Sequence, residues 1–268
     1  MRVLLCSPVR QEPDVLGAFL QGLGGLEGGA DWLLIDDNED ASSSRLLAEA
    51  RNPGGQVIVG RLPPAARPRY RRGDTHDWTD PATVVRVAQL KDQALDHARA
   101  GGYDCAFLVD SDLVLRPETL EVLLRSGKDI VSEVFWTRWT PDAPECPNVW
   151  TGDQYSFGHA PRSVEERDSQ RDAVCLALRQ PGLYRVGMLG ACTLISARAL
   201  AAADAFGRPA LRFHPPLDCC SWWGEDRHFC LRAAALGLER WADTHCPPLH
   251  LYRHEDLARL AEWRAGAP

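Results

Sequence analysis

The sequence predicts an α/β domain with three layers, in which helices cover both faces of a mostly parallel central sheet. Short continuous apolar runs, typical of strands buried on both faces, alternate with longer segments whose apolar residues recur at helical spacing. No internal repeat interrupts this alternation. Hydrophobic residues make up 45% of the 268 residues, which is enough to build a large core. We therefore expect a single domain over residues 1–268.

The first half of the chain contains five predicted strands and the helices that connect them. The strands are expected at residues 3–6, 32–35, 56–59, 105–109 and 130–136. The first helix follows Pro13 and ends at Gly24, whereas Asp80 and Pro81 provide an N-cap and a first helical residue for the longest helix. Gly101 ends that long helix. Shorter helices are expected at 42–50 and 117–127.

The second half of the chain is less regular. Residues 136–182 are rich in proline and charge and show few apolar periods, so we expect a variable loop that is functional or disordered. A glycine-rich turn and a strand follow at 186–196. Another helix follows Trp222–Asp226 and ends at Gly237, and residues 240–243 are the last predicted strand.

The composition argues against several classes of protein. A net charge of −7 disfavours a general binder of nucleic acid or of membrane surfaces. The apolar runs are too short for a membrane span or a secretory leader. The nine cysteines are an odd number, which favours reduced thiols in a cytoplasmic protein. No G-x-G-x-x-G follows the first strand and no G-x-S-x-G occurs, which argues against dinucleotide oxidoreductases and α/β-hydrolases.

Two of the predicted strands end in acidic residues. Asp36 and Asp37 follow the second strand, and Asp110 and Asp112 follow the fourth. Ligands of open parallel sheets bind beyond the carboxyl ends of the strands, and residues two apart in an extended segment point to the same side. Two carboxylates held in this way suit Mg²⁺ or Mn²⁺, which prefer oxygen ligands. The alternative is a solvated loop after a buried strand, because the D-x-D string is common.

Five short motifs resemble those of family 2-like, GT-A-fold glycosyltransferases. They lie at Ser7–Glu12, Ile35–Asp40, Leu108–Asp112, Gly187–Ser196 and Trp222–Asp226. The resemblance covers roughly residues 1–135 and 183–252. It implies a Rossmann-like GT-A sandwich with a nucleotide-sugar-binding half at 1–135, a variable loop at 136–182, and an acceptor and catalytic half at 183–268. The implied activity is transfer of a sugar from a nucleotide-diphosphate sugar to an acceptor hydroxyl.

The resemblance implies that a donor linked to UDP or GDP binds to the first half. Its contacts would come from Pro8, Arg10, Asp36, Asp37, Lys91, Asp110 and Ser111. The chain departs from the family at Gln11, where asparagine is usual, and at Lys91, because the middle helix commonly presents arginine or asparagine to the donor. The arginine-rich segment 61–72 is either a phosphate clamp or a solvated loop.

The resemblance also implies a site for Mn²⁺ or Mg²⁺. Asp112 would be the firmer ligand, with Asp110 beside it. A histidine after the last strand often completes the site in this fold, and both His245 and His250 qualify. We favour His250, because it lies beyond two prolines and can fold back toward the edge of the sheet.

Glu225 and Asp226 are the candidate catalytic acids. An inverting transfer needs a carboxylate that takes the proton of the acceptor hydroxyl, and we assign this role to Asp226 and acceptor binding to Glu225. Trp222 and Trp223 would stack on sugar faces, and Gly190 lies in the acceptor-side motif. One of the acids could instead be a helix N-cap, and in a retaining enzyme both would bind a sugar.

Two other functions remain open. A nucleotidyltransferase shares the α/β sheet and the metal carboxylates, although the first loop of this chain lacks the glycines that cradle a triphosphate. A non-catalytic protein that binds nucleotides or carbohydrates could use the same fold. The acceptor also remains open among small metabolites, lipids, peptides and nucleic acid.

Overall fold

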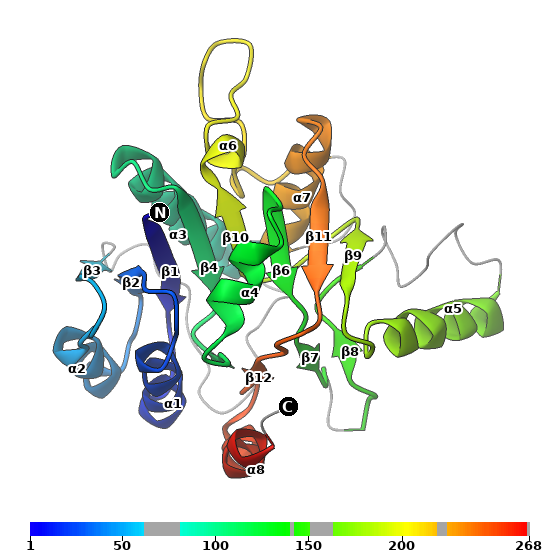
Figure 1. The fold of residues 1–268 in the computed structure, drawn as a ribbon, viewed down its shortest axis with the longest axis horizontal. Helices are drawn as coiled ribbons and strands as arrows, with labels where there is room; N and C mark the ends of the chain where they lie inside the picture. Colours follow the sequence, from blue (N-terminus) through cyan, green and yellow to red (C-terminus); the bar gives the residue numbers. More distant parts are fainter. Residues whose placement is uncertain (62–80, 140–141, 151–162, 219–223, 267–268) are drawn as a thin grey trace.

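The structure is a computed structural model, and it describes residues 1–61, 81–139, 142–150, 163–218 and 224–266. An eight-stranded sheet forms its centre (Figure 1). From one edge to the other, the strands are β3 (Val57–Arg61), β2 (Asp31–Asp36), β1 (Val3–Val9), β4 (Cys105–Val109), β10 (Cys192–Ser196), β6 (Ile130–Glu133), β11 (Arg240–Asp243) and β9 (Leu183–Val186). Of these eight strands, β10 and β9 run antiparallel to the other six.

This arrangement confirms the predicted α/β sandwich with a mostly parallel sheet. Strand β10 is inserted between β4 and β6, with Thr193 opposite Leu108 on one side and Ser132 on the other. The strand order, with one reversed strand near its centre, is consistent with a Rossmann-like GT-A fold. Because six strands share a direction, their carboxyl ends lie along one edge of the sheet.

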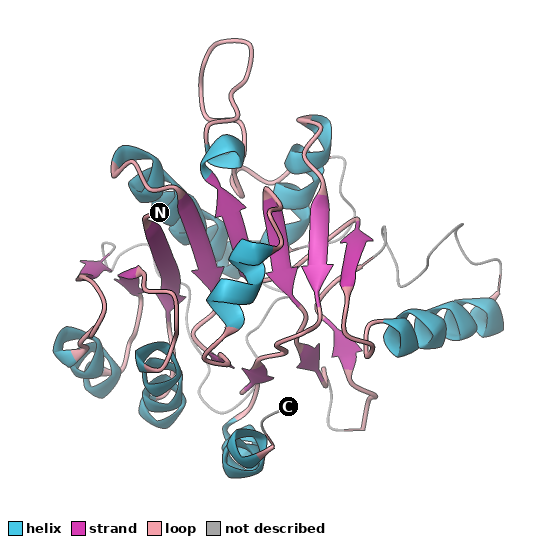
Figure 2. Ribbon diagram, in the orientation of Figure 1, coloured by secondary structure: helices cyan, strands magenta, loops and turns pink. Residues whose placement is uncertain are grey.

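Helices cover both faces of the sheet (Figure 2). One face carries α1 (Pro13–Gly24), α2 (Ala41–Glu49) and α4 (Thr119–Arg125), and the other carries α3 (Pro81–Ala100), α6 (Ala197–Leu200) and α7 (Glu225–Ala235). Side chains alternate along β1, so Leu4 and Cys6 pack with α3 whereas Val3 and Leu5 pack with α1. No helix in the described ranges combines the length and the apolar character needed to cross a membrane.

The segment 136–182 is not a structureless loop. Its described residues form β7 (Trp136–Thr137), which pairs with β8 (Cys146–Pro147), and α5 (Val164–Ala177), which projects from the body of the molecule (Figure 1). Ser163 caps α5 by accepting a hydrogen bond from the backbone N–H of Glu166. Val174 is the buried residue of this helix, which explains why no apolar period in the sequence predicted it.

A small second sheet brings the end of the chain back to the carboxyl edge of the large one. Strand β12 (Leu249–His250) pairs antiparallel with β5 (Leu113–Val114), which follows β4 closely. Beyond β12, a 3-10 helix (His254–Arg259) and α8 (Leu260–Ala265) contribute apolar side chains that pack against α1. The sequence patterns predicted no element after residue 243.

Candidate functional site

The pairing of β12 with β5 places His250 beside Asp112. The backbone N–H of Leu251 donates a 2.8 Å hydrogen bond to the carbonyl oxygen of Asp112. His250 Nε2 lies 3.3 Å from Asp112 Oδ2, and the two residues are 8% and 7% exposed. Of the two histidines considered from the sequence, His250 is therefore the one beside Asp112. His245 instead contacts Asp243, at 2.8 Å between Nδ1 and Oδ1.

Thr137 orients the imidazole of His250. Its Oγ1 lies 2.9 Å from His250 Nδ1 in a buried hydrogen bond, so the opposite ring nitrogen faces Asp112. The ring of Phe135 packs edge-on against the imidazole, with 4.9 Å between centroids. A partner that fixes the second nitrogen is a common feature of metal-binding histidines. Thr137 lies in the segment expected to be a variable loop, and no sequence pattern pointed to it.

Lys91 links acids from the two halves of the chain. Its Nζ lies 2.7 Å from Glu225 Oε1, 3.0 Å from Asp226 Oδ1 and 3.6 Å from Asp110 Oδ1. The lysine belongs to α3, the two adjacent acids begin α7, and Asp110 follows β4. The side chain of Lys91 is 1% exposed, whereas those of Asp110 and Asp226 are 36% and 27% exposed. The amine expected to face a donor therefore faces these carboxylates.

Helix capping does not account for Glu225 and Asp226. Gly224 occupies the N-cap position of α7, and no side chain makes a capping hydrogen bond there. Both acids lie in the first turn, where the helix dipole favours negative charge. Both carboxylates accept hydrogen bonds from Lys91. Their position at the start of α7 thus brings both carboxylates into contact with Lys91.

The crowding of carboxylates shifts their proton affinities. Desolvation and repulsion by Glu225 raise the pKa of Asp226 to about 8, although Lys91 opposes this shift. Desolvation raises the pKa of Asp110 to about 6, with Lys91 opposing the shift and Asp112 adding to it. Burial lowers the pKa of Lys91, but the three carboxylates outweigh burial and hold it well above its ordinary value. Positive charge near Asp110, Glu225 and Asp226 therefore stabilises their ionised forms.

The side chains of Asp110, Asp112 and His250 are of types that bind divalent cations, but they do not by themselves complete the coordination of one. Within the described ranges, no three His, Cys, Asp or Glu side chains form a closed metal site. Asp112 and His250 offer one carboxylate and one imidazole, and Asp110 lies two residues before Asp112. Mg²⁺ is commonly held by one or two carboxylates together with waters and substrate phosphates, and carboxylates also suit Mn²⁺. These donor types are ones that Mg²⁺ and Mn²⁺ accept.

The acids after β2 have partners within the fold. Asp36 Oδ1 accepts hydrogen bonds from the backbone and side chain of Asn38, at 3.0 and 2.9 Å, and from Ser44 Oγ at 3.1 Å. Asp37 forms a buried ion pair with Arg86 of α3, at 2.5 Å between Oδ1 and Nη2. The sequence reading missed Arg86. Arg86 stands within the apolar stripe of a helix, and this position could have predicted a buried ion pair. Arginine is almost never fully buried unless it is paired.

The other candidate donor contacts lie at the same edge. Pro8 pairs with Ile35 in the sheet, and Arg10 forms an ion pair with Glu39 at 2.5 Å. Ser111 is 5% exposed between the two aspartates of the D-x-D string. These residues follow or end β1, β2 and β4, which are neighbours in the sheet.

Gly190 lines a small pocket beside the candidate catalytic acids. Lys91, Asp226, Phe213 and Phe229 also line this pocket. A Cβ atom at position 190 would meet Asn148 at 3.2 Å, so glycine allows the close approach. Two other acceptor candidates, Trp222 and Trp223, lie outside the described residues, as does most of the arginine-rich segment 61–72.

Comparison with known proteins gives distant similarities. No family model matches the chain. The chain is similar to PcManGT, a mannosyltransferase from Pyrobaculum calidifontis in complex with GDP-Man and Mn²⁺, at 18% identity and a TM-score of 0.36. This similarity covers 50% of the chain and 35% of the mannosyltransferase, so the chain spans about a third of that protein. A mycobacterial protein of known crystal structure is 17% identical, with a TM-score of 0.43 over 100% of this chain and 76% of that one. An assignment of function therefore depends on the chain's own site.

Proposed function

We propose that the chain is a metal-dependent glycosyltransferase of the family 2-like group, which moves a sugar from a nucleotide-diphosphate sugar to an acceptor hydroxyl. The observation that carries this proposal is the 3.3 Å contact between His250 and Asp112. At the same edge of the sheet, Asp110 lies 3.6 Å from Lys91, which in turn holds Asp226. Together with the position of Asp110 two residues before Asp112, these contacts support one site for the candidate metal ligands and the candidate base. Parallel sheets bind their ligands at this edge.

Asp112 and His250, together with Asp110, would hold Mn²⁺ or Mg²⁺. A bound divalent cation offsets the negative charge that develops on a leaving diphosphate. The β5–β12 pairing holds the two backbones and Thr137 orients the imidazole, which supports a preformed pair of ligands. Outer partners of this kind orient metal-binding side chains.

Asp226 would accept the proton of the acceptor hydroxyl. Its side chain is 27% exposed, whereas that of Glu225 is 6% exposed and hydrogen-bonded to Lys91, so Asp226 is the acid of the pair that a hydroxyl can reach. A pKa of about 8 makes its carboxylate a stronger base than that of an ordinary aspartate. Glu225, which we expected to bind the acceptor, contacts Lys91, and Lys91 also contacts Asp226. A base of this kind serves an inverting transfer.

The nucleotide would lie against the first half of the chain. We propose contacts from Pro8, Arg10, Asp36, Asp37 and Ser111, at the ends of three adjacent strands. The buried Arg86 would act indirectly, because its ion pair holds Asp37 at the edge of the sheet. UDP and GDP are the nucleotides to test, with GDP-mannose included because the mannosyltransferase compared above is in complex with GDP-Man.

Calorimetry with UDP and GDP, each with and without Mn²⁺, tests the proposal. We expect one nucleotide to bind to the native protein in a Mn²⁺-dependent manner, and Asp112→Asn to weaken its binding at least about tenfold, or about 1.4 kcal/mol. Asp14→Asn changes an exposed acid of α1 and should bind like the native protein. Equal nucleotide affinity with and without Mn²⁺ would contradict the metal assignment.

Incubation with UDP- and GDP-linked sugars then separates catalysis from binding. We expect hydrolysis or transfer of one donor, with release of the nucleoside diphosphate. Binding without any turnover would favour the non-catalytic alternative. Release of pyrophosphate from a nucleoside triphosphate would favour a nucleotidyltransferase.

A further inference from the structure

Lysine, the residue type of Lys91, is uncommon in this chain. Lysine occurs at 2 of the 30 basic positions, Lys91 and Lys128, and arginine occupies the other 28. The lysine ammonium is a compact point charge with three donors, whereas the arginine guanidinium is a rigid planar fork. Lys91 meets carboxylates of three residues at 2.7 to 3.6 Å and is 1% exposed. A lysine at this buried position therefore matches a cluster of acids rather than one partner.

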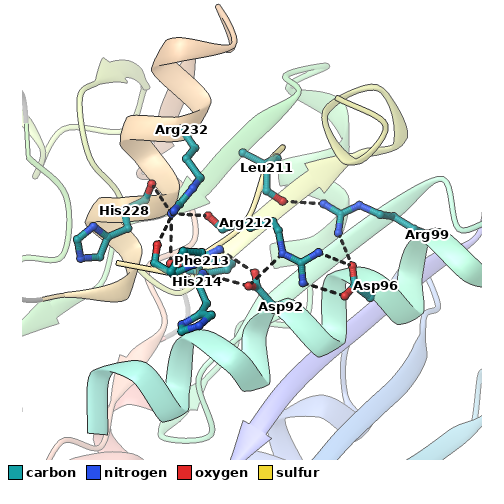
Figure 3. Close-up of polar contacts among 10 residues, drawn as sticks. Asp92, Asp96, Arg99, Leu211, Arg212, Phe213, His214, His228 and Arg232 are labelled. Atoms are coloured by element: carbon teal, nitrogen blue, oxygen red, sulfur yellow. Dashed lines mark hydrogen bonds and ion pairs between the residues drawn. The ribbon is translucent and has the colours of Figure 1, made fainter. Parts of the chain in front are cut away.

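The ammonium of Lys91 has little room to move away from the cluster. It lies 5.4 Å from the ring centroid of Phe213, which stacks on Phe229 at 4.5 Å. The backbone of Phe213 is itself held, because its N–H donates to Asp92 Oδ1 at 2.7 Å and Arg232 donates to its carbonyl oxygen at 3.3 Å (Figure 3). Asp92 follows Lys91 in α3. The helix that carries the ammonium thus also fixes the aromatic wall behind it.

We propose that Lys91 is a resident counter-ion that competes with the divalent cation for Asp110. This inference rests on the proposed function. The ammonium lies 3.6 Å from Asp110 Oδ1 and supplies positive charge to that carboxylate. A cation held by Asp112 and Asp110 brings two further positive charges to the same carboxylate, and like charges repel. Lys91 therefore lowers the affinity of the site for the cation alone, and cation binding shifts the ammonium toward Glu225 and Asp226.

The competition makes cation binding depend on the nucleotide. A nucleoside diphosphate adds negative charge beside the metal, which offsets the repulsion by Lys91. The cation therefore binds more tightly against the repulsion of the Lys91 ammonium when the nucleotide is present than when it is absent. Replacement of Lys91 by a neutral residue should accordingly affect the binding of Mn²⁺ alone more than the binding of Mn²⁺ with nucleotide.

Calorimetric titration with Mn²⁺ alone tests the inference. We expect Lys91→Met to bind Mn²⁺ at least about tenfold more tightly than the native protein. Lys128→Met is the matched control and should leave the affinity unchanged, because Lys128 lies over the ring of Trp241, at 3.9 Å from its centroid. Unchanged or weaker affinity in Lys91→Met, including undetectable binding in both proteins, overturns the inference. The proposed function fails separately, if the native protein binds neither UDP nor GDP in the presence of Mn²⁺.

A second measurement uses the native protein and so does not depend on the folding of a variant. Labelling with ¹⁵N at lysine Nζ gives two side-chain signals, one for each lysine of the chain. We expect diamagnetic Mg²⁺ to shift the Lys91 signal and to leave the Lys128 signal in place, and Asp112→Asn to abolish the shift. A Lys91 signal that stays unchanged while Mg²⁺ binds to the native protein overturns the inference.

Discussion

Thr137 Oγ1 lies 2.9 Å from His250 Nδ1, so a residue of the irregular central segment orients a residue near the end of the chain. Both side chains are buried, at 1% and 8% exposure. The hydroxyl fixes one ring nitrogen and leaves the other 3.3 Å from Asp112. Segment 136–182 therefore contributes to the proposed metal site through Thr137.

Thr137→Val removes this hydroxyl and keeps the shape of the side chain. We expect the Mn²⁺-dependent nucleotide affinity to fall by about tenfold or more, since loss of the outer partner of a metal-binding histidine typically weakens binding by about 10–100-fold. Thr137→Ser keeps the hydroxyl and should retain most of the native affinity. Calorimetry with Mn²⁺ and nucleotide measures all three proteins. An equal loss in both variants would indicate packing, rather than orientation of His250, as the role of Thr137.

Asp226→Asn preserves the size of the side chain but removes the ability to accept a proton. We expect transfer to slow by about 10²–10⁴-fold while nucleotide affinity stays native. In the native enzyme the rate should rise as the pH approaches about 8, because desolvation raises the pKa of Asp226 to that value and only its ionised form is a base. Rates and nucleotide affinities are measured on the same preparation. Full turnover of the variant would exclude Asp226 as the base.

Arg86→Met removes the buried guanidinium that pairs with Asp37. We expect the free energy of unfolding to fall by about 3–5 kcal/mol, because breaking a buried pair leaves a charge in the interior poorly compensated. Arg208→Met breaks an exposed pair with Asp204 and should lower it by about 1 kcal/mol or less. Urea denaturation compares the two variants. Similar small losses in both would contradict a structural role for the Arg86–Asp37 pair.

Glu133 and Asp243 lie in register on β6 and β11, and both are buried. Desolvation, together with the charge of Asp243, raises the pKa of Glu133 from 4.5 to about 9. The folded protein therefore holds a proton that the unfolded chain releases, so the free energy of unfolding falls as the pH rises from about 4.5 to about 9.

Glu133→Gln should remove this contribution to the pH dependence. The contribution of Glu133 to the slope is at most about 1.4 kcal/mol per pH unit for one proton. Urea denaturation of the native protein and the variant, between about pH 6 and pH 9, measures the difference. The same slope in both proteins would show that Glu133 is ionised in the folded state.

Local patterns in the sequence were sufficient for most of the architecture. Short apolar runs located β1, β2 and β4, because a strand covered on both faces is largely apolar. An apolar run also located β3, although this edge strand leaves Val59 43% exposed, and the apolar residues Ile130 and Val131 marked the start of β6. Prolines marked the starts of α1 and α3, and the acids after β2 and β4 marked the edge where the candidate site lies. Helix α5 was not predicted because apolar periodicity arises from a buried face, and Val174 is the buried residue of this helix.

The sequence by itself determined which side chains are apolar enough to be buried and where acids follow strands. Tertiary structure alone decided which charged groups meet. Arg86 and Lys91 belong to one helix, yet the first pairs with Asp37 and the second with Glu225 and Asp226. The physical reason is the distance along the sequence over which each feature is set. The apolar periodicity of a segment reflects the burial of that segment alone. An ion pair depends on which strands and helices, far apart in the sequence, become neighbours in the folded chain.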